Sequence, residues 1–143
     1  MQTILFLCTG NYYRSRFAQH LFNHLAQKQQ LHWQADSRAL ALERGVNNIG
    51  AISHYAKSAL AKRGIILLDE ERFPQAALLE DFHQFTKIIA IDESEHRPLM
   101  AERFPEWLDN IEYWLVHDID KTGAEEALGQ IEINVMGLVG GLV

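Results

Sequence analysis

The chain has 143 residues with a formal net charge of −6, and 48% of the residues are hydrophobic. This length and composition fit one globular domain with a full core. The net negative charge argues against nucleic-acid partners, because binding to phosphate backbones requires a basic excess. A single cysteine excludes an intramolecular disulfide and fits a reducing compartment. The N-terminal apolar run is too short for a signal peptide and no segment has membrane-span length, so we expect a soluble, cytoplasmic protein without a membrane partner.

The first predicted strand is the apolar run 4–7, which ends at Cys8. A loop with Gly and Asn follows, then Arg14 and Ser15, and a helical pattern begins at residue 17. Backbone N–H groups of such a loop and the helix N-terminus attract a phosphate, and the same surroundings favour a thiolate. Arg14 can hold two phosphoryl oxygens, and Ser15 can donate a hydrogen bond to sulfur. The alternative is a buried cysteine that only ends a strand, with Arg14 solvated.

These residues resemble the signature of the low-molecular-weight protein tyrosine phosphatases, where Cys, five residues, Arg and Ser follow the first strand. The positions that match are Cys8, Gly10, Asn11, Arg14 and Ser15. The resemblance implies that Cys8 is the nucleophile and Arg14 a second catalytic residue, with neither a metal nor another cofactor. It also implies that phosphate is bound by the whole loop, namely by Thr9, Gly10, Asn11, Tyr12, Tyr13, Arg14 and Ser15.

The rest of the chain alternates between helical and strand patterns. The predicted elements are a helix over 15–29, a strand over 31–35, a helix over 52–63, a short helix over 74–85, a strand over 87–92, a helix over 94–103, a strand over 111–116 and a helix over 123–139. We interpret 40–51 as a loop and 69–72 as a solvated turn, and expect the Gly-rich end 137–141 to fray.

This alternation predicts one doubly wound α/β domain over residues 1–143, with the ligand at the carboxyl ends of the strands. The family resemblance implies a four-stranded parallel sheet in the order 2-1-3-4, flanked by helices.

We also assign roles to polar residues outside the predicted phosphate-binding loop. The resemblance pairs Ser37 with Asn11 as support for the phosphate loop, whereas the family's further network histidine, between the second helix and third strand, cannot be placed. Arg16 replaces the family's usual proline and adds positive charge to the first helical turn. His20 and His24 have the spacing of a metal-ligand pair, but no third ligand is evident, so we interpret them as the polar flank of a surface helix.

A phosphotyrosine leaving group needs a proton from a carboxylic acid. In the family this acid belongs to an Asp-Pro pair after the fourth strand, often preceded by Trp-x-Val-x. Trp114, Val116 and Asp118 match this pattern, and Ile119 replaces the proline. The resemblance therefore implies Asp118 as the general acid, with Asp120 as the alternative.

The leading functional hypothesis is a cysteine-dependent phosphatase that acts on a phosphotyrosine protein or an aryl phosphate monoester through a phosphocysteine intermediate. An arsenate reductase that uses an external thiol is an alternative, since one cysteine cannot support an internal disulfide relay. A non-catalytic phosphate- or phosphotyrosine-binding module is another. Turnover of p-nitrophenyl phosphate without metal distinguishes the first hypothesis from the last.

Overall fold

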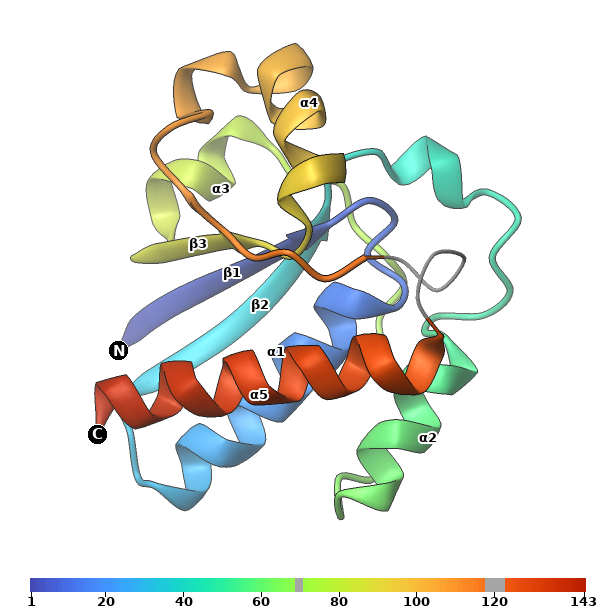
Figure 1. The fold of residues 1–143 in the computed structure, drawn as a ribbon, viewed down its shortest axis with the longest axis vertical. Helices are drawn as coiled ribbons and strands as arrows, with labels where there is room; N and C mark the ends of the chain where they lie inside the picture. Colours follow the sequence, from blue (N-terminus) through green and yellow to red (C-terminus); the bar gives the residue numbers. More distant parts are fainter. Residues whose placement is uncertain (69–70, 118–122) are drawn as a thin grey trace.

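The computed structural model describes residues 1–68, 71–117 and 123–143. These residues form a four-stranded parallel sheet in the order β2-β1-β3-β4 (Figure 1). The strands are β1 (Gln2–Cys8), β2 (Trp33–Ala39), β3 (Lys87–Ala90) and β4 (Glu112–Tyr113). The predicted α/β class and strand order are confirmed.

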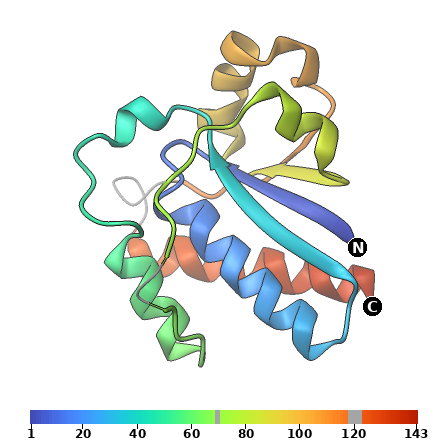
Figure 2. The same ribbon diagram turned by 180° about the vertical axis from the view of Figure 1, so that it is seen from behind.

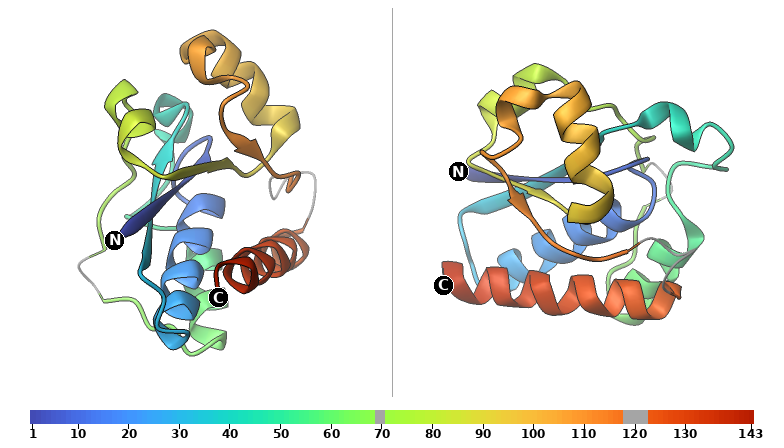
Figure 3. Two further views of the ribbon diagram at one scale, coloured as in Figure 1. Left: turned by 90° about the vertical axis from the view of Figure 1, so that its left-hand side faces the viewer. Right: turned by 45° about the horizontal axis from the view of Figure 1, so that its top comes forward.

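Helices cover both faces of the sheet. The α-helices are α1 (Arg14–Lys28), α2 (His54–Lys62), α3 (Leu79–Gln84), α4 (Glu93–Arg103) and α5 (Ala124–Leu142), and two short 3-10 helices are η1 (Leu42–Gly45) and η2 (Pro105–Trp107). Figure 3 shows α1, α2 and α5 on one side of the sheet and α3 and α4 on the other.

The central strand β1 is buried on both faces, which explains its continuous apolar run. Side chains alternate along a strand, so Ile4, Phe6 and Cys8 pack toward α1 and α5. Leu5 and Leu7 pack toward α3 and α4. The alternation places Cys8 at the carboxyl end of the central strand, on the face that α1 covers.

Strand β2 continues four residues beyond its predicted end at residue 35. Its parallel register with β1 runs from Gln2 opposite Trp33 to Cys8 opposite Ala39. The predicted end of this strand was wrong, because the backbone ladder with β1 continues through residues 36–39.

Helix α3 is shorter than the predicted helix over 74–85. Residues 75–77 are instead extended beside the end of β2, where Ala39 N–H donates to Gln75 O and Ala77 N–H donates to Ala39 O, each at 2.8 Å. Figure 2 shows residues 71–78 running past the end of β2 toward α3. The segment after α2 is therefore attached to the same end of the sheet as the Cys8 loop.

The predicted fraying at 137–141 was also wrong. Helix α5 continues to Leu142, and Val139 is buried within the glycine-rich end. The reason is tertiary, because α5 packs along α1 and the packing stabilises residues of low helix propensity. No helix within the described residues combines the length and apolar character needed to cross a bilayer.

Candidate functional site

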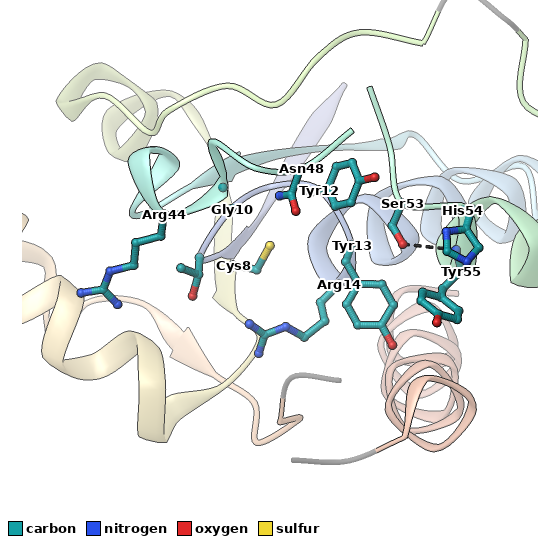
Figure 4. A pocket seen from close by; sticks show the side chains of 12 residues that line it. Cys8, Gly10, Tyr12, Tyr13, Arg14, Arg44, Asn48, Ser53, His54 and Tyr55 are labelled. Carbon is teal, nitrogen blue, oxygen red and sulfur yellow. Dashed lines mark hydrogen bonds between the residues drawn. The ribbon is translucent and has the colours of Figure 1, made fainter. Parts of the chain in front are cut away.

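A pocket of about 350 Å³ opens at the carboxyl end of β1 (Figure 4). One wall is the loop after β1, represented by Cys8, Thr9, Gly10, Tyr12, Tyr13 and Arg14. The other wall comes from η1, the residues after it and the start of α2, namely Arg44, Gly45, Asn48, Ser53, His54 and Tyr55. Ser53 caps α2 by accepting the Tyr55 N–H at 3.2 Å. The predicted loop thus borders a cavity large enough for a small ligand.

Cys8 lies at the base of this pocket and is almost fully buried. Its Sγ is 2.9 Å from Ser15 Oγ. Ser15 Oγ in turn accepts a hydrogen bond from Asn11 Nδ2 at 2.8 Å, which leaves the Ser15 hydroxyl hydrogen available for the sulfur. This geometry provides a donor to a thiolate at the Cys8 position.

The side chain of Asn11 uses its full hydrogen-bonding capacity inside the protein. Nδ2 donates to Ser15 Oγ and Ser37 Oγ, both at 2.8 Å. Oδ1 accepts from Arg72 Nη1 at 3.0 Å and from the Gln75 N–H at 3.1 Å. The backbone of Asn11 has φ +52°, a left-handed conformation that asparagine tolerates better than most residues. These four bonds fix the bend of the loop, and they include the contact with Ser37 that the resemblance implied.

Arg72 was missed by the sequence analysis, which interpreted residues 69–72 as a solvated turn. That interpretation was wrong for Glu71 and Arg72, which have partners within the protein. Residues 69 and 70 lie outside the described residues. Besides Asn11, Arg72 contacts Asp36 Oδ1 at 2.9 Å and Ser37 O at 2.8 Å through Nη2. Arg72 also lies between the second helix and third strand, the interval in which the family's network histidine could not be placed. The presence of an arginine in that interval was the signal that could have identified this partner of Asn11.

We expect Arg72→Met to weaken the binding of inorganic phosphate about tenfold. Loss of a charged partner from a buried acceptor costs about 1–3 kcal/mol, and 1.36 kcal/mol corresponds to tenfold. The control is Arg97→Met, because Arg97 is a partly exposed arginine that pairs with Asp109 outside the pocket. Calorimetric titration of both variants measures the difference. Equal phosphate affinities in the two variants would show that Arg72 does not support the loop.

Arg16 also differs from expectation, because its side chain is fully buried and does not expose positive charge at the anion site. It donates to Glu71 Oε1 at 2.6 Å and to Arg72 O at 2.7 Å. The same Glu71 oxygen lies 2.6 Å from His20 Nε2, so His20 is not merely the polar flank of a surface helix. Glu71 thereby attaches the segment before α3 to α1. The next residue, Arg72, is the one that donates to Asn11.

Burial affects the ionisation of this cluster. It lowers the pKa of His20 despite the adjacent Glu71 carboxylate. Burial acts to raise the pKa of Glu71, but the hydrogen bond from Arg16 and the contact with His20 outweigh it and keep that pKa below its ordinary value. The described residues contain no group of three or more His, Cys, Asp or Glu side chains suited to hold a metal ion.

Arg14 is buried at the inner end of the pocket, with 3% of its side chain exposed. Its Nη1 donates to Val116 O at 3.1 Å and lies 3.7 Å from Asp92 Oδ2. Its Nη2 lies 3.3 Å from both carboxylate oxygens of Glu95. The guanidinium is therefore positioned by the segment after β4 and by two carboxylates at the start of α4.

Asp92 caps α4 and keeps a negative charge beside Arg14. Its Oδ1 accepts the Ser94 N–H at 3.1 Å, and its Oδ2 lies 3.1 Å from His117 Nδ1. Burial acts to raise the pKa of Asp92, but the hydrogen bonds from Ser94 and His117 and the charge of Arg14 outweigh it, so the pKa lies below its ordinary value. Asp92 is consequently ionised at neutral pH.

Four aromatic rings line the pocket. Tyr12 is fixed by donating its hydroxyl to Ile49 O at 2.6 Å, and Tyr13 donates to Ala124 O at 3.1 Å. The rings of His54 and Tyr55 have centroids 4.1 Å apart. Figure 4 shows these side chains along one side of the opening, opposite Arg44. This lining suits a flat, apolar group attached to an anion.

Both candidates for the general acid, Asp118 and Asp120, lie outside the described residues and remain predictions. The nearest described part of that segment is at Val116 and His117, which contact Arg14 and Asp92.

A model of the low molecular weight phosphotyrosine protein phosphatases matches residues 3–129. YfkJ from Bacillus subtilis shares 25% identity with a TM-score of 0.81, over 99% of this chain and 94% of that chain. The low molecular weight protein tyrosine phosphatase from T. tengcongensis shares 22% identity with a TM-score of 0.80, over 99% of this chain and 100% of that chain.

A protein described as an arginine phosphatase, YwlE from Geobacillus stearothermophilus, is also similar. It shares 24% identity with a TM-score of 0.76, over 99% of this chain and 93% of that chain. A search of curated proteins found no match.

Proposed function

The chain belongs to the low molecular weight phosphotyrosine protein phosphatase family, and from this premise we propose that it hydrolyses phosphotyrosine or aryl phosphate monoesters through a phosphocysteine intermediate. The observation that carries the proposal is the position of Cys8 Sγ at the base of the pocket, 2.9 Å from Ser15 Oγ. A phosphate held above it would have the N–H groups of the loop and Arg14 around its oxygens.

In the first step, the Cys8 thiolate attacks phosphorus, a sulfur–phosphorus bond forms and the bond to the leaving oxygen breaks. Arg14 and the loop N–H groups stabilise the charge on the three equatorial oxygens. We assign Asp118 as the acid that gives the leaving oxygen its proton. In the second step, Asp118 takes a proton from water, the water oxygen attacks phosphorus and Cys8 leaves as a thiolate. Ser15 stabilises that thiolate by donating its hydroxyl hydrogen.

The aromatic lining supports an aryl substrate. Tyr12, Tyr13 and Tyr55 offer ring surfaces beside the opening above Cys8, where the phenyl group of phosphotyrosine would lie. The alternative within the family is phosphoarginine, the substrate type in the description of YwlE.

The test compares peptides of one sequence that carry phosphotyrosine, phosphoarginine or phosphoserine, together with p-nitrophenyl phosphate, in the presence of a chelator. We expect turnover of p-nitrophenyl phosphate and the highest kcat/KM on the phosphotyrosine peptide. Preference for the phosphoarginine peptide would contradict the aryl assignment but not the phosphatase. Phosphate binding without any turnover would favour a non-catalytic module.

A general acid matters most when the leaving group is a strong base, as a phenolate with a pKa near 10 is. We therefore expect Asp118→Asn to reduce kcat on phosphotyrosine by about 10²–10⁴-fold, the usual scale of general acid catalysis. The reduction on p-nitrophenyl phosphate should be visibly smaller, because p-nitrophenolate is a weaker base. Steady-state kinetics on both substrates measure the difference.

The matched control is Asp120→Asn, which should show little dependence on the leaving group. If the two variants exchange these behaviours, the acid is Asp120. If neither variant depends on the leaving group, this segment supplies no general acid.

A further inference from the structure

The guanidinium of Arg14 is in contact with a carboxylate of its own chain. Glu95 of α4 places both carboxylate oxygens 3.3 Å from Arg14 Nη2, and its Oε1 also accepts the hydroxyl of Thr9. Figure 4 shows the Arg14 side chain directed toward α4, the pale yellow helix. Glu95 therefore contacts two of the residues to which phosphate binding was assigned.

A hydrogen-bonded chain fixes Glu95 in this position. His96 Nδ1 accepts the Asp92 N–H at 3.0 Å, so the proton of the neutral ring is on Nε2, which lies 3.2 Å from Thr9 Oγ1. Burial, together with the charge of Arg14, lowers the pKa of His96 to about 3, so the ring is neutral at physiological pH. Thr9 therefore accepts from His96 and donates its own hydrogen to Glu95, which is three-quarters buried.

The carboxylates around Arg14 are unfavourable for a further anion. Among the described residues, its guanidinium lies 3.7 Å from Asp92 and 3.3 Å from Glu95. A phosphate that binds Arg14 must displace Glu95 from Nη2. Displacement costs binding free energy, because the attraction between the Glu95 carboxylate and the buried guanidinium is lost.

We propose that Glu95 competes with phosphate for Arg14 and thereby weakens the affinity of the site for inorganic phosphate. Within the proposed function, inorganic phosphate is the product, and Glu95 speeds its release. The role of phosphate as the product rests on the proposed function. The competition itself concerns anion binding, so it requires no turnover.

The test is calorimetric titration of inorganic phosphate into the wild type and two variants at neutral pH. Glu95→Gln keeps the size of the side chain and an acceptor for Thr9 but removes the charge. Glu93→Gln is the matched control, because Glu93 lies on the same helix, is about half exposed and pairs with Arg97 at 3.8 Å. We expect Glu95→Gln to bind phosphate about tenfold more tightly, and Glu93→Gln to stay within about twofold of the wild type.

A damaged site does not gain affinity, so tighter binding by Glu95→Gln separates competition from a structural defect. Unchanged binding would overturn the proposal, and weaker binding would show instead that Glu95 orients Arg14 for phosphate. If the protein turns over substrate, KM and the inhibition constant for phosphate should fall together in Glu95→Gln. If it turns over none, the titration alone decides the question.

A second measurement uses the wild type, so that it stands even if Glu95→Gln does not fold. In a crystal structure with inorganic phosphate bound above Cys8, we expect the Glu95 carboxylate to have left Arg14 Nη2. Persistence of the 3.3 Å contact beside the bound phosphate would contradict the competition.

Discussion

Cys8→Ser is expected to abolish turnover of p-nitrophenyl phosphate, a loss on the order of 10⁴–10⁶-fold in kcat, the scale seen when a catalytic nucleophile is removed. A serine hydroxyl is not ionised at neutral pH, and Cys8 is the only thiol in the chain. The substitution is nearly isosteric and keeps the hydrogen bonds among Asn11, Ser15 and Ser37. The loop should therefore keep its shape, and the variant should still bind inorganic phosphate.

Phosphate binding provides the internal control for this experiment. Lost turnover with retained binding assigns the chemical step to the thiol. Full activity of the serine variant would contradict the nucleophilic role of Cys8, and loss of both properties would show that the substitution had disrupted the loop.

Arg14→Lys should reduce kcat/KM although the positive charge is kept. We expect a reduction of about 10²–10³-fold, which is the scale of losing one donor to the transition state. The planar guanidinium can bind Val116 O through one nitrogen and present other N–H groups to phosphate, whereas an ammonium group is a point donor. Kinetics on p-nitrophenyl phosphate measure the effect.

The control for Arg14→Lys is Arg97→Lys, since Arg97 is a partly exposed arginine on α4 that pairs with Asp109. This control should behave like the wild type. Near-wild-type kcat/KM in Arg14→Lys would show that Arg14 does not hold the phosphoryl oxygens.

The sequence predicted those features that depend on short stretches of chain. The apolar run before Cys8 predicted a strand, and the alternation of strands and helices predicted the fold class. Cys8 and Ser15 lie within one strand–loop–helix unit, so their proximity follows from local geometry. The order of the strands and the pairing of Asn11 with Ser37 came from the family resemblance.

The contacts that sequence analysis missed join residues far apart in the chain. Arg72 reaches Asn11 and Glu95 reaches Arg14 across 61 and 81 positions, and no local pattern encodes such pairs. Charged residues were assumed to be solvated, an assumption that fails where each charge has a partner, as for Arg16 with Glu71. The predicted strand over 31–35 ended too early, because the polar residues after it continue the backbone ladder with β1.

The covalent intermediate offers the most direct test of the proposed chemistry. Wild-type protein would be mixed with an aryl phosphate, quenched rapidly and digested, and the peptides would be searched by mass spectrometry for a phosphoryl group. We expect the phosphoryl group on the sulfur of Cys8 during turnover, and none after the substrate is exhausted. Turnover with Cys8 unmodified throughout, or with the phosphoryl group on another residue, would contradict the phosphocysteine mechanism.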